Sequence, residues 1–366
     1  MRILHTEASP GWGGQEIRIL REAEGMRKRG HEVIMAINRG GGLVGPARQA
    51  GFEVYELSFE KKKLLFTLFH LLKIIWKHDI DIVNTHSSLD AWTAGIAARL
   101  SRKKVIRTRH LSTAIRPGLN SIALYNWLAD NVVTTCAAIV ETIQLQAKLP
   151  PHRCMSIPTG INPESFNVSE DEVLKLRESL GISKDTCLVG TACILRSWKG
   201  VSDLLQAAKT LQGRENIKWL IVGGGVSEKY FRDQWKDLGL QKSVIFTGHL
   251  DNPYTAIAAM DIFALLSTGN EGVSQASLQA AYLKKPLITT TIGGLPEVCI
   301  HGETGYQVGV SSFLEVAESV LLLSENIEDR MIMGERAHKL VMDRFTMNKT
   351  LNDMESIYKA ALEGNK

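Results

Sequence analysis

Short apolar runs alternate along this chain with longer segments in which apolar residues recur every three or four positions. The short runs predict buried strands, and the longer segments predict helices with one apolar face. Because the alternation recurs in both halves of the chain, it predicts two parallel sheets, each with helices, and a cleft between them. The predicted strands are residues 2–6, 31–37, 54–57, 82–84, 104–107 and 131–135 in the first half and 187–194, 219–222, 244–247, 263–266 and 287–291 in the second.

The predicted helices lie between and after these strands. They are residues 15–30, 61–77, 138–148, 169–180, 201–211, 274–284, 312–323, 329–345 and 347–362. Residues 156–162, SIPTGIN, contain a proline and a glycine, which interrupt regular structure and predict a domain boundary. The expected organisation is an N-terminal Rossmann-like domain over 1–161, a second one over 162–346, and a terminal helix within 347–366.

Composition narrows the class of protein. A chain of 366 residues is too long for one ordinary core and fits two domains. The net charge of +4 argues neither for nor against an anionic ligand, and no nucleic-acid partner is expected. The first residues leave no room for a signal peptide, and no run approaches the roughly 18 apolar residues of a membrane span, so we expect a cytoplasmic protein. The five cysteines are odd in number and lack metal-ligand spacing, which indicates a reducing compartment and no zinc site.

The segment from Ser267 to Glu297 holds the strongest candidate site. Glu271 and Gly272 separate a predicted strand from a predicted helix, where free backbone N–H groups and the helix dipole favour phosphates. Gln279 follows Glu271 by eight residues, which a helix would place roughly 12 Å away, about the length of a sugar diphosphate. Gly293 and Gly294 offer further exposed amides after the next strand. Either glycine pair could also be a simple turn.

Two other glycine-rich loops follow predicted strands. Gly13 and Gly14 precede a helix and can accept an anion, but Glu16 stands where a dinucleotide fingerprint needs its third glycine. The loop that begins at Gly223 lacks that glycine as well, because Glu228 occupies the position. A turn before a helix is the alternative explanation for the first loop.

Charged and histidine side chains also gather at the predicted carboxyl ends of strands. His86 follows one strand, and Arg107, Arg109 and His110 end the next. The two histidines could be functional or structural, and the arginines suit an acceptor that carries phosphate. Arg196 and Lys199 follow the strand 187–194 and could stabilise a departing nucleotide diphosphate, although both could also be solvated surface groups.

Asp79 and Asp81 have the spacing of a metal-binding pair. They precede a predicted strand, whereas ligands of open α/β sheets gather at the carboxyl ends of the strands. We therefore expect no metal at these aspartates and no metal requirement.

These motifs resemble the donor-binding region of retaining glycosyltransferases of family 4, which have the GT-B fold. The resemblance extends over nearly the whole chain, and its motifs come in the expected order. One position departs from the family pattern, because the second of two glutamates spaced eight apart is here Gln279. The matching positions in the second half are Glu271, Gly272, Ala280, Pro286, Gly293, Gly294, Glu297 and the segment 302–305, GETG.

The resemblance implies a role for each candidate residue. Glu271 would orient the sugar, Gln279 would hold the ribose, and His110 would contact the transferred sugar. Lys199 would stabilise the diphosphate together with Arg196, although the family often has its arginine where Ile194 stands here. Glu16, His86, Arg107 and Arg109 are assigned to the acceptor side. The implied donor site also includes Gly13, Gly14, Gly223, His249, Leu250, Gly272, Val273 and Ser274.

The expected function is metal-independent transfer of a sugar, with retention of configuration, from a nucleotide diphosphate sugar to a hydroxyl. The acceptor would be a saccharide or lipid-linked intermediate of a surface polysaccharide or lipopolysaccharide, and no cofactor is expected. A nucleotide-sugar epimerase of the same fold and a non-catalytic donor-binding subunit are the alternatives. The predicted helix 61–77 either packs in the core or lies on an anionic membrane, because Phe66, Phe69 and Trp76 widen its apolar face and Lys61–Lys63 begin it. The second case would place the protein on the inner face of the cytoplasmic membrane.

Overall fold

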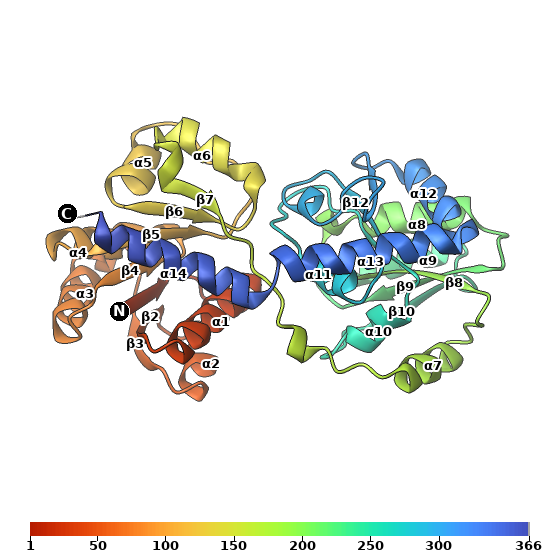
Figure 1. Ribbon diagram of the computed structural model, residues 1–366, viewed down its shortest axis with the longest axis horizontal. Coiled ribbons are helices and arrows are strands. Elements are labelled where there is room, and N and C mark those ends of the chain that lie inside the picture. Colours follow the sequence, from red (N-terminus) through yellow and green to blue (C-terminus); the bar gives the residue numbers. More distant parts are fainter. Residues whose placement is uncertain (365–366) are drawn as a thin grey trace. The chain divides into compact units, whose positions relative to one another are not determined.

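The structure is a computed structural model that describes residues 1–364, except the side chain of Lys61. The chain forms two compact units (Figure 1). Unit 1 comprises Met1–Pro158 and the chain from Asn348 onward, and unit 2 comprises Thr159–Met347. The chain therefore enters unit 2 once and returns to unit 1 at its C-terminal end.

Unit 1 contains a seven-stranded sheet in the order β3-β2-β1-β4-β5-β6-β7. All its neighbouring strands run parallel. Parallel pairing requires crossover connections, which explains why helices separate most of these strands in the sequence. The strands are β1 (Arg2–Glu7), β2 (Glu32–Asn38), β3 (Glu53–Leu57), β4 (Ile82–Thr85), β5 (Lys104–Arg109), β6 (Asn131–Thr134) and β7 (Cys154–Ser156).

The C-terminal helix packs within unit 1 although it follows unit 2 in the sequence (Figure 1). Tyr358 donates a hydrogen bond of 2.6 Å to Glu22, and Arg29 pairs with Glu355 at 2.9 Å. The helices of unit 1 are α1 (Gly14–Lys28), α2 (Val44–Gln49), α3 (Leu64–Lys77), α4 (Ser88–Leu100), α5 (Leu119–Ile122) with a π-helical turn at Ala123–Trp127, α6 (Val140–Ala147) and the terminal α14 (Met347–Glu363).

Unit 2 contains a six-stranded parallel sheet in the order β10-β9-β8-β11-β12-β13. Its core includes Trp219 of the sheet packed with Leu204, Phe231 and Val320 from three helices. The strands are β8 (Cys187–Ala192), β9 (Ile217–Val222), β10 (Val244–Gly248), β11 (Ile262–Leu265), β12 (Leu287–Thr290) and β13 (Gly305–Val308). The helices are α7 (Glu170–Ser179), α8 (Val201–Thr210), α9 (Glu228–Asp237), α10 (Tyr254–Ala259), α11 (Gln275–Tyr282), α12 (Phe313–Glu325) and α13 (Ile327–Arg344).

Two parallel sheets with helices confirm the predicted α/β class of fold with two Rossmann-like units. In a parallel sheet, the loops after the strands meet at one edge, where ligands of α/β proteins bind. The candidate residues of the sequence lie in such loops in both units, for example His86 after β4 and Glu271 after β11. Within residues 1–364, no helix combines the length and the apolar character needed to cross a membrane.

Candidate active site

A buried ion pair joins two loops of unit 2. Lys199 ends a short 3₁₀ turn after β8, and Glu271 lies in the loop after β11. The ammonium of Lys199 donates to Glu271 Oε1, and Ser267 Oγ donates to the same oxygen at 2.6 Å. Glu271 is 5% exposed, so its charge needs these partners. Two residues from separate motifs are therefore in direct contact, and Ser267 is a third member without a predicted role.

Glycines allow the two loops to approach each other closely. Gly200, with φ of 69°, lies against the backbone of Leu266, and Gly293, with φ of 58°, lies against the backbone oxygen of Glu271. A Cβ at either position would overlap these backbone atoms, and both φ values disfavour other residues. Backbone contacts that only glycine permits therefore place the loops of Lys199 and Glu271.

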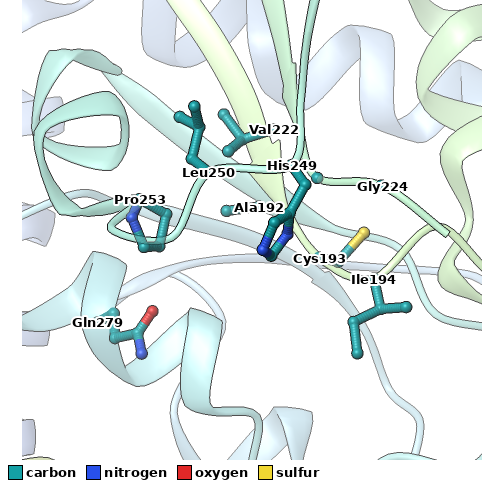
Figure 2. Close-up of a pocket in the computed structure, with 10 residues that line it drawn as sticks. Ala192, Cys193, Ile194, Val222, Gly224, His249, Leu250, Pro253 and Gln279 are labelled. Carbon is teal, nitrogen blue, oxygen red and sulfur yellow. The ribbon is translucent and has the colours of Figure 1, made fainter.

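A pocket of about 170 Å³ opens at the carboxyl ends of β8, β9 and β10. Figure 2 shows His249, Leu250 and Pro253 on one stretch of chain, with Gln279 of α11 also at the pocket. This volume is below the about 300–1000 Å³ typical of sites for drug-sized ligands, so the pocket suits one ring of a larger ligand. Four of the lining residues, Gly223, His249, Leu250 and Gln279, were assigned to the donor from the sequence. The other lining residues were not predicted: Ala192, Cys193, Ile194, Val222, Gly224 and Pro253.

Helix α11 begins one residue after the start predicted from the sequence. Ser274 caps it, with a side chain that accepts from Ser277 N at 3.4 Å, and Gln275 is its first residue. Glu271 lies before the helix, so the helical rise does not give its distance from Gln279, and the estimate of roughly 12 Å does not apply. Val273 and Ser274 are buried, and Gly272 is half-buried.

Arg196 is exposed and lies over the ring of Trp198, with its guanidinium carbon 5.2 Å from the ring centre. Among the residues that the structure describes, it makes no ion pair. Lys199 and Arg196, which were predicted as one group, therefore differ, since only Lys199 contacts Glu271.

Three histidines of unit 1 form a hydrogen-bonded chain. His5 Nδ1 lies 2.9 Å from His86 Nε2, and His86 Nδ1 lies 3.0 Å from His110 Nε2. His5 and His86 are buried, and His110 is half-buried. Burial lowers the pKa of all three rings, most strongly those of His86 and His110, so the rings are neutral. His5 was not predicted; its position near the carboxyl end of β1 could have indicated it.

Two buried carboxyl groups hold the neighbouring loops. Asp90 accepts hydrogen bonds from the backbone N–H groups of His86, at 2.9 Å, and Ser87, at 2.8 Å. Glu7 accepts from the Ser87 hydroxyl and from the Gln15 amide at the start of α1. Burial, together with the charge of Glu7, raises the pKa of Asp90 to about 7, and burial also raises the pKa of Glu7. The sequence pattern did not identify either carboxyl group.

Packing does not require a glycine at the first position of α1. Helix α1 begins at Gly14 after an extended Gly13, and a Cβ at Gly14 would meet no atom within 4 Å. Glu16, in the first helical turn, is 5% exposed. The space beside Gly14 is therefore open to a ligand that approaches the backbone.

Arg107 and Arg109 point into unit 1. Arg107 is 2% exposed with its guanidinium carbon 5.7 Å from the ring centre of Tyr125, and Arg109 donates to Tyr125 Oη at 2.9 Å. Arg109 also donates to the backbone oxygen of Thr113 at 2.5 Å, so it anchors the segment after β5. Contact of these arginines with an acceptor stays a prediction.

Asp79 and Asp81 lie before β4, away from the carboxyl ends of the strands. Asp79 pairs with Arg2 at 2.5 Å and with Lys103 at 3.0 Å. Asp81 accepts a hydrogen bond of 2.7 Å from the backbone N–H of Arg2. Both aspartates therefore have a structural role, because each binds groups of the neighbouring chain segments.

The sequence matches two family models. Residues 12–165 match the model described as Glycosyltransferase Family 4, and residues 173–340 match the model described as Glycosyl transferases group 1. A similar relative is N-acetyl-alpha-D-glucosaminyl L-malate synthase of Bacillus anthracis, which is 28% identical over 81% of this chain and 79% of its own length. Another is the capsular polysaccharide biosynthesis glycosyltransferase CapM of Staphylococcus aureus, which is 23% identical over 82% of each chain.

A solved structure supports the same fold. The Anabaena protein HepE in complex with UDP aligns with a TM-score of 0.87 and 20% identity over 98% of this chain and 100% of its own. The two matched families adjoin along the sequence and cover most of both units. The chain therefore belongs to the family 4, group 1 glycosyltransferases, which have the GT-B fold.

Proposed function

We propose that this glycosyltransferase moves a sugar from a nucleotide diphosphate sugar to a hydroxyl acceptor with retention of configuration and without a metal ion. The observation that carries the proposal is the contact of Lys199 with Glu271 at the carboxyl ends of β8 and β11. An ammonium there can neutralise a diphosphate, and a carboxylate beside it can orient sugar hydroxyls. A nucleobase or ribose would occupy the pocket of His249, Leu250 and Gln279.

Lys199 can serve the carboxylate and the ligand together. An ammonium has three N–H donors, and one is directed at Glu271. The others remain for phosphate oxygens, whose negative charge grows as the bond from the sugar to the diphosphate breaks. The acceptor oxygen would attack the sugar on the face that the diphosphate leaves, and the acceptor proton would pass to the departing phosphate oxygen. Arg196, which is exposed after β8, would add a second positive charge.

Similar proteins support the proposed classes of substrate. HepE was solved with UDP, so a uridine diphosphate sugar is the first donor to test. CapM is named for capsular polysaccharide biosynthesis, which supports a saccharide or lipid-linked acceptor in the assembly of a surface polysaccharide or lipopolysaccharide. The neutral ring of His86 in unit 1 suits an acceptor with many hydroxyl groups, and the open space beside Gly14 leaves room for the donor.

We infer that α3 contacts an anionic membrane surface, which would place the protein on the inner face of the cytoplasmic membrane. One face of the helix packs inward through Leu71, Ile74 and Ile75. The opposite face exposes large apolar side chains. The same helix and the turn before it expose lysines that could contact anionic headgroups, among them Lys62, Lys73 and Lys77. The side chain of Lys61 lies outside the described residues. The exposed fractions are 79% for Leu65, 64% for Phe66, 54% for Phe69 and 64% for Trp76.

Co-sedimentation with lipid vesicles tests the membrane contact. The protein should bind phosphatidylglycerol vesicles more than phosphatidylcholine vesicles, and Phe69→Ser with Trp76→Ser should abolish the difference. Leu145→Ser, at a 72% exposed leucine of α6, is the control. Equal binding by the double variant and the wild type would refute the contact.

Product analysis tests the transfer reaction. The protein should convert a nucleotide diphosphate sugar and a hydroxyl acceptor into a glycoside whose anomeric configuration, read by NMR, matches that of the donor. Activity should survive EDTA. An inverted product, or activity that EDTA abolishes and magnesium restores, would refute the corresponding part of the proposal. An altered sugar nucleotide without acceptor would indicate an epimerase, and binding without any turnover would indicate a donor-binding subunit.

A further inference from the structure

The histidine chain of unit 1 ends in two unequal ways. At the inner end, His5 Nε2 is buried and has no hydrogen-bond partner in residues 1–364. At the outer end, His110 is half-buried, and the described residues offer no hydrogen bond to its Nδ1. His86 lies between them and uses both ring nitrogens. A ligand could therefore reach the chain at His110 Nδ1.

Neutral imidazoles restrict how protons can be arranged in this chain. Each ring has one N–H group and one bare nitrogen, and each hydrogen bond needs one of each. Since His86 takes part in both bonds, the donors must all point the same way. The chain then has two arrangements, with the N–H of His110 on Nε2 and directed at His86, or on Nδ1 and directed outward.

The surrounding charges distinguish the two arrangements. The carboxylate of Glu22 raises the pKa of His5, although burial lowers it more. Arg18 and Arg107 lower the pKa values of His86 and His110 beyond the effect of burial. His5 pairs in register with Asn84, whose side-chain amide donates a hydrogen bond of 3.2 Å to Glu22 Oε1, so the Glu22 carboxylate lies near His5 and stabilises an N–H at the inner end of the chain. All three rings would then carry their proton on Nε2.

We propose that His5 and His86 are positioning residues that hold His110 with its proton on Nε2, so that His110 Nδ1 accepts a hydrogen bond from a hydroxyl of a bound saccharide. This inference rests on the proposed function for the identity of the ligand. A bare nitrogen accepts from O–H groups and repels phosphate or carboxylate oxygens, which have no proton to donate. The chain would therefore make this point of unit 1 selective for hydroxyl groups.

Nitrogen-15 NMR of histidine-labelled, ligand-free protein tests the tautomer without requiring activity. The signals of His110 are assigned by their loss in His110→Asn. The wild type should show a protonated Nε2 and a bare Nδ1 at neutral pH. A proton on Nδ1, or a doubly protonated ring, would overturn the proposal even if sugar transfer is established.

Two substitutions of His5 test the role of the chain. His5→Asn keeps a side-chain oxygen near the former Nδ1, whereas His5→Leu keeps apolar bulk and removes the acceptor. His5→Leu should give His110 a measurable population of the Nδ1–H tautomer, and His5→Asn should keep the wild-type state. An unchanged tautomer in folded His5→Leu protein would overturn the positioning role. His152→Leu, at an exposed histidine of unit 1, is the control.

Kinetics then test the ligand. His5→Leu should raise the KM of the saccharide substrate about 3- to 10-fold, the order expected for one neutral hydrogen bond. His5→Asn should restore it, and the affinity for free nucleoside diphosphate should be unchanged in both variants. If the tautomer shifts while the KM does not, the contact with a hydroxyl is refuted and the chain is only structural.

Discussion

The two units position their candidate site residues by different means. In unit 2, Gly200 and Gly293 bring loop backbones into contact, and the loops carry an ion pair between Lys199 and Glu271. In unit 1, a side chain positions the loop, because the carboxyl group of Asp90 accepts hydrogen bonds from two backbone N–H groups, those of His86 and Ser87. The absence of a side chain is therefore structurally required at Gly200 and Gly293 of unit 2, whereas Gly14, at the start of α1 in unit 1, has open space beside it.

The candidate site residues of the two units also differ in charge. Unit 2 presents opposite charges, Lys199 and Glu271, that pair with each other. Unit 1 presents neutral rings, because burial and nearby arginines lower the pKa values of His86 and His110. We therefore expect charge substitutions to affect turnover most in unit 2, and hydrogen-bond substitutions to affect recognition most in unit 1.

The largest expected effect comes from Lys199→Ala. If the ammonium stabilises charge that develops in the transition state, turnover at saturating donor should fall by about 10²–10³-fold. Lys229→Ala removes a lysine whose side chain is 89% exposed, and it should leave turnover unchanged. Turnover of Lys199→Ala at the wild-type level would refute the electrostatic role of unit 2.

Glu271→Gln removes the negative charge and keeps an oxygen for Ser267. Turnover should fall by roughly 10–100-fold, the range of a lost charged hydrogen bond. Binding of free nucleoside diphosphate should persist or tighten, because Lys199 loses its competing carboxylate. Calorimetry of nucleotide binding and saturating-donor kinetics separate the two effects. Glu318→Gln, at an exposed residue of unit 2, is the control, and loss of nucleotide binding in folded Glu271→Gln would contradict the assignment.

A matched pair of glycine substitutions tests the structural comparison directly. Gly293→Ala should lower the free energy of unfolding by about 1–3 kcal/mol, because the new Cβ meets the backbone of Glu271 at a φ of 58°. Gly14→Ala should leave stability unchanged or slightly raised, since its Cβ meets no atom, while it weakens donor binding. Denaturant unfolding measures the free energy of unfolding of both variants, and calorimetry measures their affinity for the donor. Equal stability of the two variants would remove the contrast between the units.

The pH dependence of stability tests the buried carboxyl groups of unit 1. The pKa of Asp90 is raised from its ordinary value of 3.8 to about 7 in the folded state, so its contribution is fully present below about pH 4 and is lost progressively as the pH rises from there through about 7. Between pH 5 and pH 8, the wild type should therefore lose about 2–3 kcal/mol of stability relative to Asp90→Asn. Unfolding curves of the wild type and Asp90→Asn at both pH values measure this change. If the difference in their free energies of unfolding does not vary with pH, the raised pKa of Asp90 is refuted.

The smallest effect is expected from Gln279→Glu. A carboxylate accepts hydrogen bonds from ribose hydroxyls more strongly than an amide, so donor affinity should stay equal or rise by about 2- to 5-fold. Gln241→Glu adds the same charge at an exposed position of unit 2 and controls for net charge. A folded Gln279→Glu variant that no longer binds donor would mean that Gln279 donates through its amide or only packs.

The strands were easier to predict than the helices. Apolar runs such as that of β9 are buried on both faces in a parallel sheet, so they stand out in the sequence. Helix α4 was missed because it buries Ala91, Ala94 and Ala98, which give a weak apolar period. Helix α9 was missed as well, because Phe231 is its only buried residue in the part that the structure describes.

Sequence by itself determined the class of fold and the loops that carry the candidate residues. Local periodicity identifies strands, and the direction of a parallel strand decides which of its ends faces a ligand, so Glu271, Lys199, His86 and His110 could be named without coordinates. The contacts among these residues were decided by tertiary structure alone. The hydrogen bonds of Ser267 with Glu271 and of His5 with His86, and the pocket that Gln279 and His249 both line, depend on strand order and loop packing, which bring together side chains that no local pattern relates.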